Sequence, residues 1–233
     1  MGSFVNITRD EYISMFKLQG ELNDATNTTT WLKEAIGKYG NIIDWFLCMS
    51  QETSEAIDSI QWKHWKDTKV AAQYEYLNKD NVKTELTDIW HFLMSQILVR
   101  GELLLAVNSL IHEDGEYVPL INGKEVLSAL KDFQLVVLSE RETEVLLHKF
   151  FRLVVSVFDD PRDLLKSYMK KNVLNQFRQD HGYTTGTYIK VWSGEEDNVY
   201  LDKYNGEYEY NAIYEYLNKN YKEFAIVDSN TSK

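Results

Sequence analysis

Apolar residues recur every three or four positions along much of the chain, a spacing typical of helices with one buried face. The strongest such run extends from Asn81 to about Leu110, and another extends from Asn41 to about Ile60. The expected buried positions are Val82, Leu86, Ile89, Leu93, Ile97 and Leu104 in the first run, and Ile42, Trp45, Phe46, Met49, Ala56, Ile57 and Ile60 in the second. The pattern therefore predicts two long helices.

Weaker runs and helix-boundary signals predict the remaining elements. We expect helices over 10–24, 125–138, 140–158, 162–180 and 209–224, with a surface insertion or small cap over 112–124. Pro161 favours a helix start, and Gly182 favours a left-handed helix stop. The last six residues, DSNTSK, are expected to fray. The fold class predicted from this pattern is all-α.

Composition narrows the kind of protein. Apolar residues make up 44% of the 233 residues and charged residues 26%, which is ordinary for a globular protein. The single Cys48 excludes an intrachain disulfide framework, and no apolar run reaches membrane-spanning length, so we expect a cytoplasmic protein without a membrane partner. The net charge of −11 argues against a protein that mainly binds nucleic acid.

Four carboxylates form two E-x-x-[E/D] pairs, Glu52 with Glu55 and Glu85 with Asp88, one pair in each of the two long predicted helices. Residues three apart lie on the same helix face, so each pair directs two oxygen ligands at one place. Each pair also borders an apolar stripe, where acids are costly unless a cation or hydrogen bonds neutralise them. All-oxygen ligation favours Mg²⁺, which indicates phosphate chemistry.

The alternative interpretation of these acids is a solvated surface, because glutamates three or four residues apart are common on exposed helices. One pair alone would carry little weight, whereas two pairs beside apolar neighbours favour a metal site. Asp58 extends the first series, and we expect it to support a ligand or to cap the helix rather than to bind the metal.

A basic stripe follows in the segment KNVLNQFRQDHGY. Lys171, Asn175 and Arg178 share one helix face, and Tyr183 and Lys190 follow the helix end. Arginine offers a fork of N–H groups for phosphate oxygens, and lysine offers a mobile point charge. The alternative is a solvated helix face, which the spacing alone favours.

Two further groups of side chains are candidates for contacts with a base. Trp62 and Trp65 enclose Lys63 and His64, and indoles beside cations can stack on a nucleobase. Tryptophans at a helix end equally often cover a core. The second group is the pair Gln19 and Asn23, four residues apart on the first predicted helix, whose amides suit the polar edge of a pyrimidine.

These residues lie in four segments that closely resemble the dimeric all-α dUTPases, a branch of the all-alpha NTP pyrophosphatase superfamily. The segments are LQGELND (18–24), SQETSEAIDSIQWKHWKD (50–67), VKTELTDIWHFL (82–93) and KNVLNQFRQDHGYTTGTYIKVWSGEEDN (171–198). The acidic signature marks only the superfamily, whereas IDS-x-x-WKHWK together with KNVLN-x-FRQ-x-x-GY is more specific. The chain departs most from the family over 68–81 and 108–145.

The resemblance implies a role for each candidate residue. The implied Mg²⁺ ligands are Glu52, Glu55, Glu85 and Asp88, and the implied phosphate-binding residues are Lys171, Asn175, Arg178, Tyr183 and Lys190. The implied base and sugar contacts are Gln19, Asn23, Trp62 and Asn198, with Lys63, His64 and Trp65 supporting the pocket. Two or three Mg²⁺ ions would bind, and Glu52, with Glu55 as the other candidate, would take a proton from the attacking water.

The resemblance also implies the architecture and the activity. We expect one all-α domain over 1–233, a helical bundle with a four-helix core, rigid over about 1–107 and 140–224 and with a mobile cap over about 108–139. The implied activity is hydrolysis of dUTP, and of dUDP, to dUMP by a homodimer.

Two alternatives stay open. The first is a MazG-like pyrophosphohydrolase of the same superfamily, with a broader preference for the base. The second is a helical interaction protein, because some phage-encoded relatives also bind a repressor protein.

Overall fold

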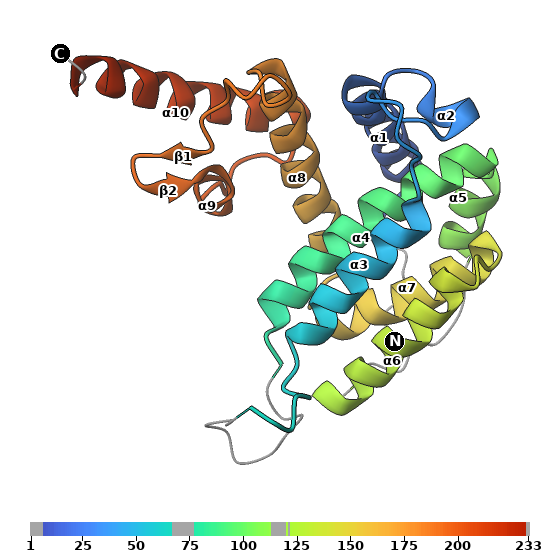
Figure 1. Ribbon diagram of the computed structural model, residues 1–233. Helices are drawn as coiled ribbons and strands as arrows, with labels where there is room; N and C mark the ends of the chain where they lie inside the picture. The colour runs from blue at the N-terminus through green and yellow to red at the C-terminus, as the bar shows by residue number, and fades with distance from the viewer. Residues whose placement is uncertain (1–6, 67–76, 113–119, 121, 232–233) are drawn as a thin grey trace. The chain divides into compact units, whose positions relative to one another are not determined.

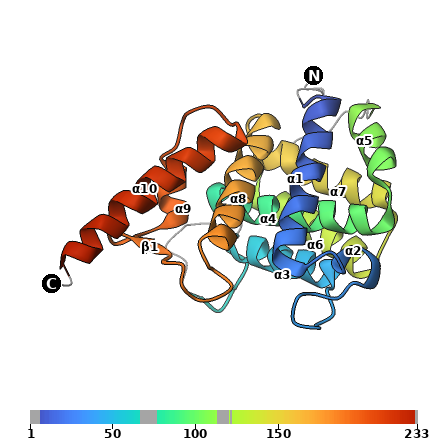
Figure 2. The same cartoon turned by 90° about the horizontal axis from the view of Figure 1, so that it is seen from above.

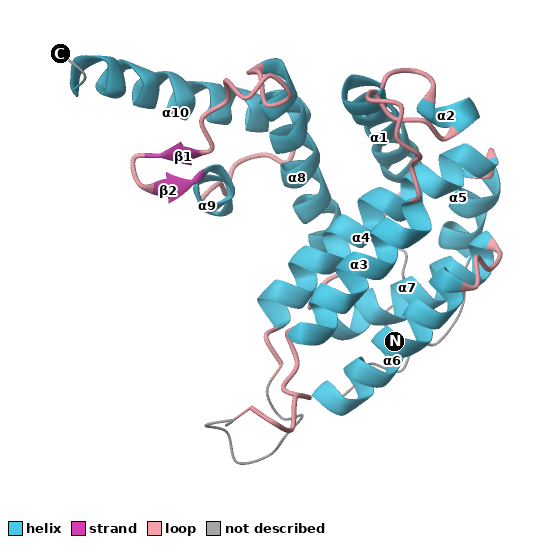
Figure 3. Cartoon of the chain, in the orientation of Figure 1, coloured by secondary structure: helices cyan, strands magenta, loops and turns pink. Residues whose placement is uncertain are grey.

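The computed structural model describes residues 7–66, 77–112, 120 and 122–231, apart from the side chains of His112 and of 222–231. Helices make up most of this part of the chain, as Figure 3 shows, which confirms the all-α fold class. The chain divides into two compact units, Met1–Tyr168 and Met169–Lys233. Most of the 112–124 insertion and most of 68–81 lie outside the described residues.

Several helices of the larger unit begin and end within three residues of the predicted positions. This unit contains α1 (Arg9–Asn27), α2 (Trp31–Glu34), α3 (Trp45–Asp58), α4 (Lys79–Arg100), α5 (Leu103–His112), α6 (Gly123–Leu138), α7 (Thr143–Val157) and the first part of α8 (Arg162–Asp180). Among the described residues, no helix has the length and apolar character needed to cross a membrane.

Four helices form the core of the larger unit. Helix α3 packs on α4 and on α6, and α7 closes the arrangement by packing on α6 and α4, as the two views in Figures 1 and 2 show. Aromatic rings fill the centre: Trp90 of α4 stacks on Phe150 of α7 with ring centroids 5.5 Å apart. Phe133 of α6 lies 6.0 Å from the same Phe150. The predicted four-helix core is therefore present.

The predicted stripe of α4 is buried, but the helix is shorter than expected. Val82, Leu86, Ile89, Leu93 and Ile97 are all fully buried. The prediction of one helix to Leu110 was wrong because Gly101 adopts a left-handed conformation (φ +69°) and ends α4. Leu104 follows this break and is 61% exposed, so its predicted burial was wrong.

Capping residues set the starts of α1 and α3. Thr8 and Glu11 form a capping box at α1, and the Asp44 carboxylate accepts a hydrogen bond from the Leu47 amide at the start of α3. Because α3 begins at Trp45, Ile42 lies outside the helix and is exposed, contrary to the prediction. The position of Asp44, rather than the apolar period, sets the start of this helix.

Helix α6 falls within 108–139, the segment expected to form a cap. Its buried residues Val126, Leu130 and Phe133 pack toward the core. The Gln134 amide nitrogen also donates to the Ser54 hydroxyl of α3 at 2.9 Å. Whether this segment moves as a cap, and whether the two units act as a single domain, stay predictions.

The smaller unit contains the rest of α8, a short hairpin and two further helices. The strands β1 (Val191–Trp192) and β2 (Glu195–Glu196) pair antiparallel, and α9 (Asp197–Asp202) and α10 (Tyr210–Thr231) follow. Gly182 has a φ of +87° after the end of α8, which confirms the predicted stop. Helix α10 continues to Thr231, so fraying from Asp228 onward was wrongly predicted.

Candidate functional site

Helices α3 and α4 bring three of the four predicted metal ligands together. One carboxylate oxygen each from Glu52, Glu85 and Asp88 lies within 4.8 Å of the others. Glu85 is only 8% exposed, and the other two are half-buried. We call these three residues the carboxylate cluster. The two helices can place the acids in this way because they lie side by side at the centre of the bundle.

A side chain that the sequence did not indicate holds Glu85 in place. The Asn81 amide nitrogen, one turn earlier on α4, donates to a Glu85 carboxylate oxygen at 3.0 Å. The same nitrogen donates to the Ser59 hydroxyl at 2.7 Å, which links the end of α3 to α4. Glu85 is therefore oriented before any ligand arrives.

The carboxylate cluster concentrates negative charge. Burial, followed by the charges of Asp88, Glu55 and Glu85, raises the pKa of Glu52 to about 7. Burial and the charges of Asp88 and Glu55 also raise the pKa of Glu85, although hydrogen bonds from Glu52 and Asn81 oppose the shift. A divalent cation would relieve this repulsion, and its donor set would consist of carboxylate oxygens, the ligands that Mg²⁺ prefers.

Glu55, the fourth predicted ligand, lies beside the cluster but outside it. Its side chain is exposed and accepts a hydrogen bond from the Gln51 amide nitrogen at 3.0 Å. Its charge still acts on Glu52 and Glu85. A change of rotamer would be needed to bring its carboxylate among the other three.

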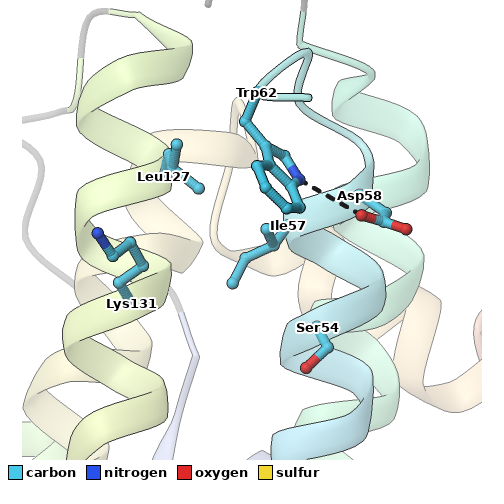
Figure 4. A pocket seen from close by; sticks show the side chains of 6 residues that line it. All are labelled: Ser54, Ile57, Asp58, Trp62, Leu127 and Lys131. Carbon is cyan, nitrogen blue, oxygen red and sulfur yellow. Dashed lines mark hydrogen bonds between the residues drawn. The ribbon is translucent and has the colours of Figure 1, made fainter. Parts of the chain in front are cut away.

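The predicted aromatic group follows α3 and borders a cavity. Trp62 lines a cavity of about 520 Å³, whose other lining residues are Ser54, Ile57, Asp58, Leu127 and Lys131 (Figure 4). Asp58 accepts hydrogen bonds from the Trp62 indole nitrogen at 3.3 Å and from the Lys63 ammonium at 2.6 Å. Asp58 therefore holds Trp62 and Lys63 in place, and its expected role in supporting a metal ligand or capping the helix stays a prediction.

Trp65 and His64 lie beside Trp62. The rings of Trp62 and Trp65 meet edge to face with centroids 5.5 Å apart, and the His64 ring lies 5.0 Å from Trp65. Trp65 is 61% exposed, so the core alternative does not hold for this tryptophan. The three rings form an aromatic group after the end of α3, in which Trp62 is half-buried and His64 and Trp65 are exposed.

The cavity and the carboxylate cluster lie on different faces of α3. Ser54, in the cavity wall, is hydrogen-bonded to Gln134 of α6, whereas Glu52 faces Glu85 and Asp88 of α4. At about 100° per residue, Ile57 and Glu52 are separated by about 140° around the helix axis. The space beside Trp62 is therefore not the space between the metal-ligand candidates.

Gln19 and Asn23 belong to a buried hydrogen-bond network. Both are 3% exposed, and both side-chain amides donate to the Ser95 hydroxyl, at 3.1 Å for Gln19 and 2.9 Å for Asn23. The Gln19 carbonyl oxygen lies 2.7 Å from the His91 Nδ1 atom, and the Tyr168 hydroxyl lies 3.5 Å from the same oxygen. The sequence did not indicate His91, Ser95 or Tyr168, because no local spacing connects them to α1.

In the smaller unit, a buried carboxylate organises several of the predicted phosphate-binding residues. Asp197 is fully buried and accepts hydrogen bonds from Arg178 Nε and Nη2, both at 2.8 Å. It also accepts one from the Tyr188 hydroxyl at 2.7 Å. Arg178 Nη1 donates to the Asn175 side-chain oxygen at 3.2 Å. We call Asn175, Arg178, Tyr188 and Asp197 the arginine cluster.

The remaining predicted residues of this unit lie around the arginine cluster. The Arg178 guanidinium lies 5.9 Å from the centre of the Tyr183 ring, and the backbone N–H of Asn198 donates to Asp197 at 2.8 Å. Lys190 forms an exposed ion pair with Glu196 at 2.9 Å. Lys171 lies on α8, two turns before Arg178, and is half-buried. Asp197, which the sequence analysis missed, stands next to Asn198 in the quoted segment GEEDN.

The predicted site residues thus form separate groups within each unit. The larger unit holds the carboxylate cluster, the Gln19 network and the aromatic group, and the smaller unit holds the arginine cluster. The roles assigned to these residues stay predictions.

Comparison with known proteins identifies a family. A family model described as dUTPase matches residues 11–183, which is most of the chain and includes both acidic pairs. A search of the curated proteins found no match.

Proposed function

The chain belongs to the all-alpha dUTPase family and is a dUTP diphosphatase, and from this premise we propose that it hydrolyses dUTP, and also dUDP, to dUMP in a Mg²⁺-dependent reaction at the carboxylate cluster. One observation supports this proposal above the others. Glu52, Glu85 and Asp88 converge within 4.8 Å of one another. Their chemistry fits a hard divalent cation.

Glu52, Glu85 and Asp88 would hold the metal, two or three ions in all, with Glu55 completing the set after a change of rotamer. When bound, Mg²⁺ neutralises phosphate charge and makes a water molecule more acidic. The 3.0 Å hydrogen bond that Asn81 donates to Glu85 would keep this carboxylate oriented toward the metal. Glu52, the member of the cluster on α3, would accept the proton of the attacking water, with Glu55 as the alternative acceptor.

The smaller unit would supply the cationic side chains. Lys171 and Arg178 would stabilise charge on the departing phosphate groups, the kind of contribution that dominates phosphoryl transfer. Asn175, Tyr183 and Lys190 would contact further phosphate oxygens. Two N–H groups of Arg178 are not used by the hydrogen bonds seen among the described residues, which is enough for a two-point contact with a phosphate.

For the base and sugar, we propose Gln19, Asn23, Trp62 and Asn198, supported by Lys63, His64 and Trp65. The Gln19 network supports this role because its amides are held in fixed orientations by Ser95 and His91. A fixed amide discriminates between donors and acceptors on a pyrimidine edge. Rejection of dTTP would require tight packing against C5 of the base.

We also propose that the protein is a homodimer. Leu47 of α3 and Leu138 of α6 are 62% and 59% exposed. Gln134, one turn before Leu138, is hydrogen-bonded to Ser50, one turn after Leu47, so the two leucines lie at the same end of this helix pair. Sedimentation of Leu47→Glu and Leu138→Glu variants tests this proposal, which predicts a shift to monomer.

Product analysis with each deoxynucleoside triphosphate, with Mg²⁺ and with EDTA, tests the function. We expect dUMP and pyrophosphate from dUTP, dUMP and phosphate from dUDP, and no turnover in EDTA. Comparable hydrolysis of dCTP or dTTP would instead favour the MazG-like alternative.

A matched pair of variants tests the site. Glu52→Gln is expected to abolish turnover, whereas Glu21→Gln, at an exposed position of α1 paired loosely with Lys17 at 3.8 Å, is expected to leave it unchanged. Full activity of Glu52→Gln would exclude the proposed site. Binding of a protein partner by an inactive but folded variant would support the regulatory alternative.

A further inference from the structure

The hydrogen bonds of Arg178 leave a defined part of its guanidinium available. Arginine carries five N–H groups. Nε and one N–H of Nη2 are bonded to Asp197, and one N–H of Nη1 is bonded to Asn175. Among the described residues, two N–H groups are left over, one on each terminal nitrogen. Each of them can donate to a phosphate oxygen, and donors on two neighbouring nitrogens suit two oxygens of one phosphate.

Asp197 is fixed from several sides. Its two oxygens accept four hydrogen bonds, from Arg178 Nε, Arg178 Nη2, the Tyr188 hydroxyl and the Asn198 amide. Burial by itself would raise the pKa of Asp197, but the hydrogen bonds from Arg178 and Tyr188 hold it below its usual range. The carboxylate therefore stays charged at neutral pH and continues to hold the guanidinium.

The aromatic core of the smaller unit anchors this arrangement. Tyr188 stacks on Tyr221 with ring centroids 5.5 Å apart and meets Phe177 edge to face at 6.3 Å. Phe177 precedes Arg178 on α8, so the core fixes both the helix that carries the arginine and the tyrosine that orients the aspartate. A long, flexible arginine side chain is thus confined to one orientation, at a lower entropic cost when phosphate binds.

We propose that Asp197 is a positioning residue that acts through Arg178, holding its guanidinium so that the two outer N–H groups meet phosphate oxygens of dUTP. This inference rests on the proposed function, in which Arg178 binds phosphate. Two other interpretations of the ion pair exist. Asp197 could be purely structural, or it could compete with phosphate for Arg178, and the experiment separates these from positioning.

The test is a double-mutant cycle measured with dUTP and Mg²⁺. Asp197→Asn, Arg178→Ala and the double variant are compared with the unmodified protein for kcat and KM. Asp197→Asn is expected to lower kcat roughly 10- to 100-fold, because a misplaced charge loses most of its effect on the transition state. In the Arg178→Ala background the same substitution should change kcat less than about twofold, because Asp197 affects the reaction only through Arg178.

Three outcomes would overturn the proposal. Additive losses of kcat in the double variant would mean that Asp197 acts independently of Arg178. A KM for dUTP that falls in Asp197→Asn would mean that the carboxylate competes with phosphate. An unchanged kcat in Arg178→Ala would show that Arg178 takes no part in the reaction. None of these outcomes would contradict the proposed metal site, which is tested separately by Mg²⁺-dependent turnover of dUTP by the unmodified protein and by the activity of Glu52→Gln.

A matched tyrosine pair keeps the test valid if Asp197→Asn does not fold. Tyr188→Phe removes one hydrogen bond to Asp197, and Tyr214→Phe removes a similar bond to the exposed Asp180, at 2.8 Å. Tyr188→Phe should lower kcat roughly threefold to tenfold, and Tyr214→Phe should not. Equal kcat values for these two variants would contradict the proposal.

Discussion

The carboxylate cluster of the larger unit and the arginine cluster of the smaller unit both hold partly buried charge, but the first brings like charges together and the second pairs opposite charges. Glu52, Glu85 and Asp88 face one another, and burial, followed by the charges of Asp88 and Glu55, raises the pKa of Glu52 and of Glu85. Asp197 faces Arg178, and its pKa is lowered. Acids held close together are costly unless something compensates for their charge, whereas the buried charges of Asp197 and Arg178 compensate for each other.

This difference indicates which cluster is organised around a ligand. Repelling acids persist in a folded protein when something else compensates for them, and a bound divalent cation does so directly. A satisfied ion pair needs no ligand and instead provides a fixed orientation. We therefore expect the two clusters to respond in opposite ways to substitution, to metal and to pH.

The largest effect should follow from Glu85→Gln. Loss of a buried metal ligand should reduce kcat/KM for dUTP roughly 1000-fold. The same change removes repulsion, so in EDTA the melting temperature should rise by about 2–4 °C. Steady-state kinetics and calorimetry measure the two effects, and a variant that is both less active and less stable in EDTA would contradict this account of the cluster.

Asp197→Asn should have the opposite effect on stability. Arg178 would lose its charged partner in a buried position, at a cost of about 3 kcal/mol in the free energy of unfolding. Urea denaturation followed by circular dichroism measures this loss. Stability equal to that of the unmodified protein would show that the arginine cluster is not the closed ion pair described above.

Glu55→Gln should have an intermediate effect, because Glu55 lies beside the carboxylate cluster rather than within it. We expect kcat to fall roughly 10- to 100-fold while the apparent affinity for Mg²⁺ weakens. Activity as low as that of Glu85→Gln would show that Glu55 turns into the site during the reaction. Unchanged activity would exclude it as a ligand and as the proton acceptor.

The pH dependence of stability in EDTA should show the smallest effect. The folded-state pKa of Glu52, about 7, lies above its ordinary value of 4.5, so its stabilising contribution is complete below pH 4.5 and is lost as the pH rises to about 7. Allowing for its partial exposure, we expect Glu52→Gln to remove about 1 kcal/mol of this pH dependence. The contribution of Asp197 has the opposite sign and is lost only as the pH falls below 3.8.

The same contrast explains what the sequence could predict. Local signals predicted both ends of α8, since Pro161 precedes its start and Gly182 follows its end. The E-x-x-[E/D] spacing indicated three acids that do converge. The break at Gly101 was missed because apolar residues continue on both sides of it, so the periodicity showed no interruption.

Side chains that act through distant contacts were also missed. Ser95 and His91 join Gln19 across more than 70 positions of sequence, and Asp197 joins Arg178 across 19. Such pairings depend on how helices pack, which single-helix spacing does not encode. Asn81 is the exception, because it stands one turn before Glu85 and a helical projection would have shown the pair.

Metal binding by the carboxylate cluster is the central claim, and titration of the protein with Mn²⁺, followed by the electron paramagnetic resonance signal of the free ion, tests it most directly. The account predicts that the unmodified protein binds Mn²⁺, that Mg²⁺ displaces it, and that Glu85→Gln loses this binding while Glu21→Gln keeps it. Equal Mn²⁺ binding by the unmodified protein and by Glu85→Gln would contradict it.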